Sequence, residues 1–422
     1  MRVDLLSTGR ELLDGRIQEA NAYRAAGWLF ERGFGVGHMA VVSDGLEDLV
    51  QAMRQGLASA DALVCSGGLG PTEDDRTSQA AAELCSRELV TDEKLLGQLQ
   101  ARFAEWGLAW TDNQARQARF PSGARPIENP LGTAPGFELD ISGRHLFCLP
   151  GPPAEFTAMF RGPVLERLER LRRQGGGGEF FQGRILRVFG RGEGWLQDTL
   201  AGVEEKYTGL ELGFRAALPE IELVLRVQAG EPAAASRLLD QVERDIRRRL
   251  GHHVFSRGSA TLPQVLLERL RAAGRTLAVA ESCTGGLVGK LLTDIPGASR
   301  SFVLSAVTYS DAAKQSLLDV DGDIIAAHGA VSVQCAEAMA RGVQRLSGAD
   351  LAVAVTGIAG PDGCSPEKPV GLVWFAVCDA RGCQTRQLRF PPRDRDFVRR
   401  LAAHAALWLV LRRLAGEDEP AA

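Results

Sequence analysis

Apolar runs of strand length alternate with amphipathic segments of helix length at the start of the chain, and this alternation restricts the fold more than any other feature. The runs at 2–9, 37–43 and 60–68 have the apolar character of buried strands. The segments at 21–33 and 46–59 have the period and length of helices. Such an alternation predicts a mostly parallel sheet covered by helices on both faces. Ligands of these sheets bind at the carboxyl ends of the strands.

Glycine-rich breaks divide the chain into three predicted domains. Four consecutive glycines at 175–178 close the first α/β domain, which spans residues 1–173. A small α+β domain at 180–256 follows, with the order strand, helix, strand, strand, helix. A second break near 255–263 precedes another α/β domain at 260–416, where apolar runs again alternate with helical segments. A chain of 422 residues is long enough for three such domains.

Composition and charge exclude several classes of partner. The net charge of -4 supplies no basic field, and acids offset the basic residues of the middle domain, so direct nucleic-acid binding is not expected. No signal-peptide pattern or apolar run of about 18 residues is present, so no membrane segment is expected. The segment at 401–416 is predicted to be a buried amphipathic helix. The eight cysteines form no C-x-x-C pair, which favours buried thiols in a reducing, cytoplasmic compartment.

The first candidate site is the loop after the third apolar run, where glycines precede acids. Glycine amides can approach a phosphate closely because no Cβ atom intervenes. A threonine can cap the following helix, and adjacent aspartates are the oxygen ligands that a divalent cation takes beside a phosphate. A glycine turn with an acidic first helical turn explains the same pattern, and spacing alone does not decide between the two. The residues are Gly67, Gly68, Gly70, Thr72, Asp74 and Asp75.

Other irregular loops of the first domain also carry polar side chains. Glu11 and Asn21 follow the first strand, while Asn129, Thr133 and Glu155 lie in loops rich in glycine and proline. Connections between helices and strands do not require several polar loops of this kind. Their presence favours a ligand site over a purely structural turn.

The second candidate site lies in the last domain, where a buried strand ends at Ser282. A strand-to-helix turn exposes such a hydroxyl beside backbone amides. Tyr309 and Lys314 occur at the next strand-to-helix turn, and a lysine can act as the base for a serine. Another buried strand ends in Thr356 and Gly357, whose amides can bind a phosphate or an oxyanion. A helix-capping serine and a surface lysine remain the alternatives on local pattern alone.

The chain resembles the competence/damage-inducible CinA family over essentially its whole length. In the first domain the matching motifs are "GRELLDGRIQEANA", "SGGLGPTEDDRT", "NPLGTAPGF" and "LPGPPAEF". The resemblance implies a three-layer α/β fold like that of molybdopterin-binding proteins, and hydrolysis of the diphosphate of ADP-ribose with a divalent metal ion. The sequence departs from the family pattern at Arg10, where the family usually has Asp or Thr, and at Glu19, where the family usually has Asp. The implied substrate contacts are Gly67, Gly68, Gly70, Thr72 and Asn21, and the implied metal ligands are Asp74, Asp75 and Glu11.

The last domain resembles the CinA C-terminal domain through "AESCTGG", "DIPGAS", "VTYSDAAK", "GAVS", "AVTGIAGP" and "KPVGLV". The resemblance implies an amidohydrolase that converts nicotinamide mononucleotide and water into nicotinate mononucleotide and ammonia, without a cofactor. In the implied mechanism Ser282 attacks the carboxamide, Lys314 takes its proton, and Tyr309 assists. Cys364 stands where the family usually has glycine. The implied substrate contacts are Glu281, Thr284, Gly285, Gly286, Thr356, Gly357 and Gly360.

These expectations describe a bifunctional enzyme of pyridine-nucleotide salvage, and the resemblance also implies a homodimer. A competence or DNA-damage adaptor without catalysis is an alternative from a different class. A molybdopterin-binding protein is a further alternative, which rests on the fold of the first domain alone.

Overall fold

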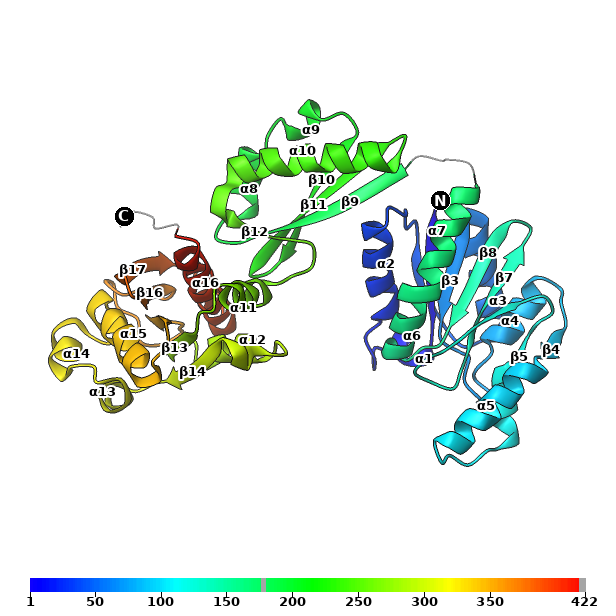
Figure 1. Ribbon diagram of the computed structural model, residues 1–422, viewed down its shortest axis with the longest axis horizontal. Coiled ribbons are helices and arrows are strands. Elements are labelled where there is room, and N and C mark those ends of the chain that lie inside the picture. Colours follow the sequence, from blue (N-terminus) through cyan, green and yellow to red (C-terminus); the bar gives the residue numbers. More distant parts are fainter. Residues whose placement is uncertain (176–179, 417–422) are drawn as a thin grey trace. The chain divides into compact units, whose positions relative to one another are not determined.

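The computed structural model describes residues 1–175 and 180–416 (Figure 1). The chain divides into two compact units. The first unit consists of Met1–Gly183, Tyr207–Glu211 and Arg226–Gln241, and the second contains the remainder of the described chain. The described strands form a six-stranded and a five-stranded sheet, a four-stranded sheet from the middle of the chain, and a two-stranded pair.

A six-stranded sheet organises the first unit. Its strands are β1 (Val3–Thr8), β2 (Met39–Val42), β3 (Ala62–Ser66), β6 (Arg125–Ile127), β7 (Gly136–Ile141) and β8 (Arg144–Leu149). They are arranged in the order β2-β1-β3-β8-β7-β6. The first four run parallel, and β7 and β6 continue the sheet in antiparallel fashion. The predicted mostly parallel sheet is confirmed, and it brings the ends of β1 and β3 together.

Helices cover both faces of this sheet and produce the predicted three layers (Figure 1). Alternation along β3 explains why, since Ala62 and Val64 enter one apolar cluster while Leu63 and Cys65 enter the other. Helices α2, α6 and α7 complete the first cluster, and α3 and α4 complete the second. The helices are α1 (Arg10–Leu13), α2 (Asn21–Glu31), α3 (Leu46–Ser59), α4 (Thr77–Leu84), α5 (Glu93–Glu105), α6 (Pro153–Met159) and α7 (Leu165–Gln174).

Four short elements of the first unit lie outside the main sheet. Strands β4 (Leu89–Thr91) and β5 (Arg119–Pro121) form a two-stranded antiparallel pair. The 3-10 helix η1 (Asp112–Ala118) leads directly into β5. A π-helical segment, η2 (Phe160–Val164), joins α6 to α7 and contains Pro163.

The middle of the chain forms a four-stranded sheet in the order β10-β11-β9-β12. The predicted order of strand, helix, strand, strand and helix is confirmed. The fourth strand, however, occupies residues that the sequence pattern identified as a break, and it pairs with β9 in antiparallel fashion. The elements are β9 (Phe180–Val188), α8 (Glu193–Thr199), α9 (Val203–Lys206), β10 (Leu210–Ala217), β11 (Glu220–Ala229), α10 (Pro232–Leu250), η3 (Gly251–His253) and β12 (Val254–Arg257).

The last domain is built on a five-stranded sheet. Its strands are β13 (Leu277–Glu281), β14 (Phe302–Val307), β15 (Leu351–Gly357), β16 (Leu372–Asp379) and β17 (Gly382–Arg389), in the order β14-β13-β15-β16-β17. The first three are parallel and the last two antiparallel. The helices are α11 (Leu262–Ala272), α12 (Leu287–Thr293), η4 (Ala298–Arg300), α13 (Asp311–Leu318), α14 (Gly322–His328), α15 (Val333–Ser347) and α16 (Arg395–Leu414).

Helices again cover both faces of the sheet in the last domain. One apolar cluster joins the sheet to α11, α12 and α16, and another joins it to α13 and α15. The predicted amphipathic helix near the end of the chain is confirmed as α16, which buries residues such as Leu407 and Val410. No helix of the described residues is both long and apolar enough to span a bilayer.

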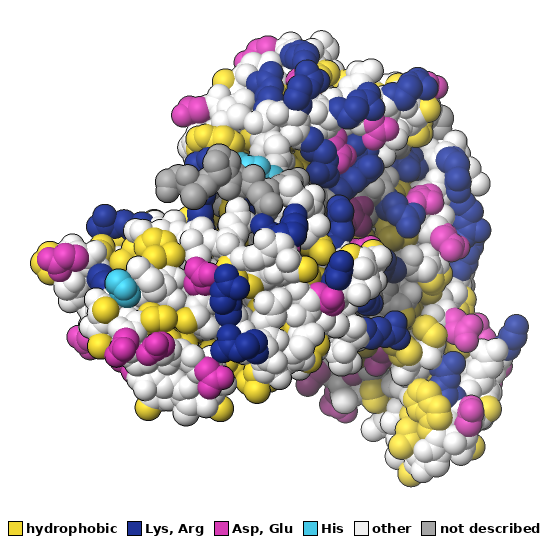
Figure 2. All heavy atoms as spheres, turned by 60° about the vertical axis from the view of Figure 1, so that its left-hand side comes forward, with side chains coloured by type: hydrophobic (Ala, Val, Ile, Leu, Met, Phe, Trp, Pro, Cys, Tyr) yellow, Lys and Arg dark blue, Asp and Glu magenta, His cyan; other side chains and the backbone are white. Residues whose placement is uncertain are grey.

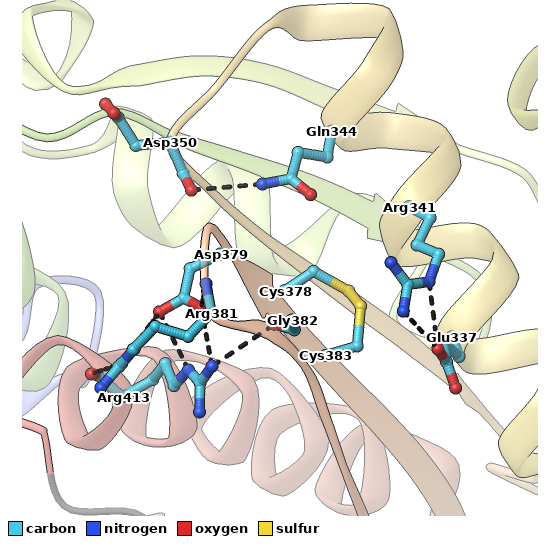
Figure 3. The surroundings of a disulfide bond; sticks show 10 residues. All are labelled: Glu337, Arg341, Gln344, Asp350, Cys378, Asp379, Arg381, Gly382, Cys383 and Arg413. Carbon is cyan, nitrogen blue, oxygen red and sulfur yellow. Dashed lines mark hydrogen bonds and ion pairs between the residues drawn. A yellow bond between two sulfur atoms is a disulfide. The ribbon is translucent and has the colours of Figure 1, made fainter.

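The cysteines do not all follow the expectation of buried free thiols. Cys378 and Cys383 are direct partners across the antiparallel β16–β17 pair, and they form a disulfide with a Cα–Cα distance of 4.0 Å (Figure 3). Cys364 is exposed. The expectation is met at Cys65 and Cys148, which are buried free thiols like Cys283 and Cys335. The sequence pattern did not predict this disulfide, because it did not predict the hairpin that places the two cysteines opposite each other.

The surface carries charges of both signs. Basic side chains are interspersed with acidic, apolar and uncharged ones on the face shown in Figure 2. In the middle sheet, Arg187 donates to Glu220 at 2.6 Å and to Glu222 at 2.7 Å. Arg184 donates to Glu243 at 2.7 Å. Acidic partners therefore offset the arginines of the middle sheet, as the composition predicts.

Candidate functional site

The first candidate site is a cavity of about 870 Å³ beside the carboxyl ends of β1 and β3. Gly9 follows β1, while Gly67 and Gly68 follow β3, and all three line the cavity. The glycine loop thus borders a cavity at the edge of the sheet where ligands of parallel sheets bind. The other charged and hydroxyl-bearing residues of the lining are Thr8, Arg10, Glu11, Arg16, Ser43, Asp44, Asp48, Asp74, Asp75, Arg76, Thr133 and Glu155.

Close contacts explain why glycine occupies the start of this loop. A Cβ atom on Gly67 would lie 2.7 Å from Thr8 O, and one on Gly68 would lie 2.4 Å from Thr77 Oγ1. Both glycines also have positive φ angles, of 107° and 67°. Thr77 Oγ1 donates to Gly67 O at 2.8 Å and holds the loop against the start of α4. Gly67 N also donates to Leu149 O at 2.9 Å, so the loop borders the cavity in a fixed conformation that other residues rarely adopt.

The predicted metal ligands line the same cavity, but they do not form a closed metal centre. Asp75 Oδ2 accepts hydrogen bonds from Thr72 Oγ1 at 2.6 Å and from Thr72 N at 2.9 Å. Asp74 lies on the cavity wall, and the Glu11 carboxylate lies against Gly9. Among the residues that the structure describes, no three His, Cys, Asp or Glu side chains are grouped so as to hold a metal ion. Thr72 closes the loop through Asp75 and is not part of the cavity lining.

Asn21 lies behind the cavity wall. Its Nδ2 donates to Ser66 Oγ and to Gly151 O, both at 2.8 Å, and its side chain is buried. Asn21 therefore joins the end of β3 to the loop after β8, which lines the cavity. Glu19 accepts from Ala22 N at 2.7 Å and caps the start of α2.

Several residues of the cavity were not predicted from the sequence. Asp44 accepts from Thr8 Oγ1 and from Arg10 N, both at 3.0 Å, and so ties the loop after β1 to the loop after β2. Arg16 and Arg76 add positive charge to the lining. The rule that ligands bind beyond parallel strands could have identified Asp44, since it lies two residues after the end of β2.

Asn129 organises the two glycine- and proline-rich loops. It donates to Ala134 O at 2.8 Å and to Glu155 Oε2 at 2.7 Å, and its Oδ1 accepts from Gly132 N at 2.9 Å. Thr133 and Glu155 line the cavity, whereas Asn129 is buried. The polar loops of the sequence therefore meet at one site, where Asn129 supports the side chains that face the cavity.

The second candidate site lies at the ends of β13, β14 and β15. Ser282 follows β13, its side chain is 8% exposed, and its amide donates to Val355 O at 3.0 Å. Lys314 on α13 is 1% exposed, and its Nζ donates to Thr308 O at 3.0 Å. Thr308 N in turn donates to Glu281 O at 2.8 Å. These bonds place the buried amine and the serine in neighbouring turns of the sheet.

The loop after Ser282 is held from inside the domain. Glu281 is fully buried, and its carboxylate accepts from Val288 N at 3.0 Å and Gly289 N at 2.8 Å. Ser305 Oγ donates to the same carboxylate at 2.8 Å. These contacts of the Glu281 carboxylate are with the protein itself, so Glu281 supports the loop, and its contact with substrate stays a prediction.

Other groups of this loop are arranged around the serine. Gly285 and Gly286 have positive φ angles of 59° and 90°, which favour glycine. Thr284 is fully buried, and its Oγ1 has no hydrogen-bond partner among the described residues. Burial raises the pKa of the neighbouring Cys283 thiol to about 12. Cys283 is therefore protonated near neutral pH and supplies no thiolate beside Ser282.

Two arginines of α16 join the loops of the second site, and the sequence patterns did not predict them. Arg395 donates from Nη2 to Tyr309 Oη and from Nη1 to Gly360 O, both at 2.6 Å. Arg399 donates to Thr284 O at 2.8 Å. Tyr309 is 61% exposed, so its ring reaches solvent while its hydroxyl is held by Arg395. No local motif around these arginines indicates such contacts.

The loop after β15 is fixed by backbone contacts. Thr356 is buried and donates from Oγ1 to Ala330 O at 2.7 Å. A Cβ atom on Gly357 would lie 2.7 Å from Leu372 O, so the close approach of β16 requires glycine. Gly360 has a φ of 80°, and its carbonyl accepts from Arg395. The three residues therefore shape this edge of the site, and their predicted contacts with substrate stay predictions.

Comparison with known proteins places the chain in a family. Residues 259–414 match the model of the CinA C-terminal domain, and residues 4–170 match that described as "Probable molybdopterin binding domain". Residues 183–256 match the damage-inducible protein CinA KH domain. The three models follow one another along the chain in the order of the domains described above.

The relatives agree with these models. A CinA-like protein of Geotalea uraniireducens is 40% identical over 97% of this chain and 97% of its own length. A CinA-like protein of Myxococcus xanthus is 40% identical over 98% of each chain. The chain therefore belongs to the CinA-like proteins. A solved structure of competence/damage inducible protein CihA from Agrobacterium tumefaciens is 39% identical, covers 36% of this chain and 93% of its own, and has a TM-score of 0.36.

Proposed function

We propose that this CinA-like protein is a bifunctional enzyme of pyridine-nucleotide salvage. Its C-terminal domain deamidates nicotinamide mononucleotide to nicotinate mononucleotide and ammonia, and its N-terminal domain hydrolyses the diphosphate of ADP-ribose. The proposal depends most on one observation in the C-terminal domain. The Ser282 hydroxyl and the buried Lys314 amine lie in neighbouring turns at the ends of parallel strands.

In the proposed deamidation, Ser282 Oγ forms a bond to the carboxamide carbon while Lys314 Nζ takes the hydroxyl proton. The carbon–nitrogen bond then breaks, and the departing nitrogen takes that proton and leaves as ammonia. Water attacks the resulting ester, which releases the carboxylate and restores the serine. Backbone amides near Gly285, Gly286 or Gly357 stabilise the oxyanion, and Arg395 orients the Tyr309 hydroxyl.

In the N-terminal domain, the arginines of the cavity and the glycines Gly68 and Gly70 of its lining support binding of a diphosphate. The donor set also fits a divalent cation, since hard cations bind through one or two carboxylates together with substrate phosphates and water. Asp74 and Asp75, with Glu11, would hold it, and its chemistry would be to neutralise charge on the diphosphate. Because three protein ligands are not grouped among the described residues, cation binding would depend on the nucleotide.

An ammonia assay on the full chain tests the proposal. The wild-type protein should release ammonia from nicotinamide mononucleotide, and Ser282→Ala should lose this activity at least about 1,000-fold because no other hydroxyl replaces the nucleophile. Ser347→Ala is the matched control, since Ser347 bonds only within and just beyond α15. If Ser282→Ala released ammonia as fast as the control, the mechanism would be wrong.

One observation favours a second candidate function for the N-terminal domain. Residues 4–170 match a family model named for molybdopterin binding, so the cavity could hold the phosphate of a pterin instead of ADP-ribose. Pterin fluorescence in the purified protein would support that alternative. A competence adaptor without catalysis remains the rival if neither hydrolysis is found. The homodimer and the cytoplasmic location stay predictions, which measurement of the mass in solution and cell fractionation would test.

A further inference from the structure

A second, smaller cavity lies behind the glycine loop of the N-terminal domain. Its volume is about 290 Å³, a third of the 870 Å³ of the main cavity. Gly68, Leu69, Gly70, Asp75 and Gln117 line both cavities. The glycine loop and Gln117 therefore form a shared wall, so that a ligand lying across the loop would contact both sides.

Gln117 in this shared wall is a buried polar side chain with an unused hydrogen-bond acceptor. It lies in η1 and is only 5% exposed, yet its Oε1 has no hydrogen-bond partner among the described residues. Its Nε2 donates to Gln114 Oε1 at 3.3 Å, which leaves the carbonyl end of the amide unused. A buried acceptor without a donor costs about 1–3 kcal/mol. Oε1 itself is inaccessible in this conformation, so a hydroxyl or amino group of a bound ligand would remove that cost once the Gln117 side chain turned its amide toward the cavity.

Positive charge borders the smaller cavity on the same side. Arg116 and Arg119 flank Gln117 along η1 and β5, and both line this cavity. Neither guanidinium makes an ion pair or side-chain hydrogen bond within the described part of the chain. Two such guanidiniums favour a phosphate, because arginine presents several donors in the geometry that phosphate oxygens accept.

We propose that the smaller cavity is a subsite for the phosphoribosyl half of a nucleoside diphosphate sugar. Arg116 and Arg119 bind its phosphate, and a ribose hydroxyl donates to Gln117 Oε1. The smaller volume suits this half, and the main cavity takes the larger nucleoside half. The inference builds on the proposed ADP-ribose hydrolysis and identifies Gln117 as a residue that determines which sugar phosphate is accepted.

Calorimetric titration of the full chain tests this subsite with two separate probes, ribose 5-phosphate and AMP. The wild-type protein should bind both. Gln117→Leu and Arg119→Gln should each weaken binding of ribose 5-phosphate about tenfold while changing that of AMP less than about twofold. Arg125→Gln is the charge-matched control, because Arg125 is exposed on β6 and lines neither cavity. Arg119 is also exposed, so its variant tests the subsite even if Gln117→Leu does not fold.

The subsite is wrong if ribose 5-phosphate does not bind to the wild-type protein, or if both variants bind it as tightly as the control does. Equal weakening of both probes would also overturn it, since that result indicates a general disturbance of the cavity. A parallel assay of ADP-ribose cleavage separates this outcome from failure of the proposed function. If ribose 5-phosphate binding depends on Gln117 but ADP-ribose is not cleaved, the subsite is supported and the hydrolase is rejected. If Gln117→Leu cleaves ADP-ribose with an unchanged KM, the hydrolase is supported and the subsite is rejected.

Discussion

The two candidate sites occupy equivalent places in two α/β domains but are built in different ways. The N-terminal site is a large cavity lined by glycines, carboxylates and arginines. The C-terminal site instead depends on Ser282 and Lys314, whose side chains are almost fully buried. The first arrangement suits a large charged ligand that brings its own counter-ion, and the second suits a reaction carried out by protein side chains. The predictions below are designed to separate the two.

The largest effect is expected for Lys314→Met. Methionine fits the buried stem but cannot accept a proton, so deamidation should fall about 100- to 10,000-fold. Lys290→Met is the matched control, because Lys290 is an exposed lysine of α12 paired with Asp294. The rate of ammonia release measures the effect in both variants. A Lys314→Met protein that keeps half of the wild-type rate would exclude the lysine as the base.

Chelation should separate the two sites. EDTA should reduce ADP-ribose cleavage at least about 100-fold, since a divalent cation stabilises diphosphate charge by several kcal/mol. The same treatment should leave ammonia release from nicotinamide mononucleotide unchanged, because that reaction uses only side chains. Both products are measured from one EDTA-treated sample, and readdition of Mg²⁺ or Mn²⁺ provides the control. Loss of ammonia release on chelation would contradict the contrast between the sites.

The glycine loop can be tested with a matched pair of substitutions. Gly68→Ala introduces a Cβ at 2.4 Å from Thr77 Oγ1, whereas Gly143→Ala has a similar positive φ with nothing within 4 Å. Both should lose about 1–2 kcal/mol through backbone strain, and Gly68→Ala should lose more through the clash. Thermal melting measures this loss, and ADP-ribose cleavage should decline only in Gly68→Ala. Equal melting temperatures would show that the loop tolerates a side chain.

A smaller effect is expected from His253 at the end of η3. Burial lowers the pKa of His253 to about 4, from an ordinary value of 6.5. Between pH 6.5 and pH 4, His253 is therefore protonated in the unfolded chain but neutral in the folded chain. The free energy of unfolding consequently falls as the pH decreases from 6.5 to 4. His253→Gln should reduce the difference in Tm between pH 7.5 and pH 5.0 by about 1–2 °C. His328→Gln, on the short helix α14, should leave that difference unchanged.

Much of the fold follows from local patterns, because alternating strand and helix periods determine which faces are buried. The short strand β12 was missed for a physical reason. Its four residues lie close to Gly258 and Pro263, which are typical of loops, and its stability comes from pairing with β9. The disulfide between Cys378 and Cys383 was missed for a related reason, since it depends on the register of the β16–β17 hairpin.

The residues of the candidate sites also fall into those that local sequence patterns predict and those that they do not. Residues that follow strands, such as Gly67 and Ser282, could be identified from the sequence, because the ends of parallel strands meet at one edge. Residues that reach a site from elements distant in the sequence could not be identified in this way. Arg395 contacts Tyr309 from a helix far along the chain, and Gln117 reaches its cavity from a 3-10 helix outside the main sheet. No periodicity or motif encodes such contacts.

The position of α16 has a consequence for the biogenesis of the protein. Arg395 and Arg399 tie the loops at Thr284, Tyr309 and Gly360 together, yet a ribosome makes them more than one hundred codons after the serine. A nascent chain therefore carries its proposed nucleophile long before the two arginines that hold the neighbouring loops are made. Premature termination inside this helix would leave a polypeptide with every predicted reactive group present but without the contacts that hold the loops at Thr284, Tyr309 and Gly360.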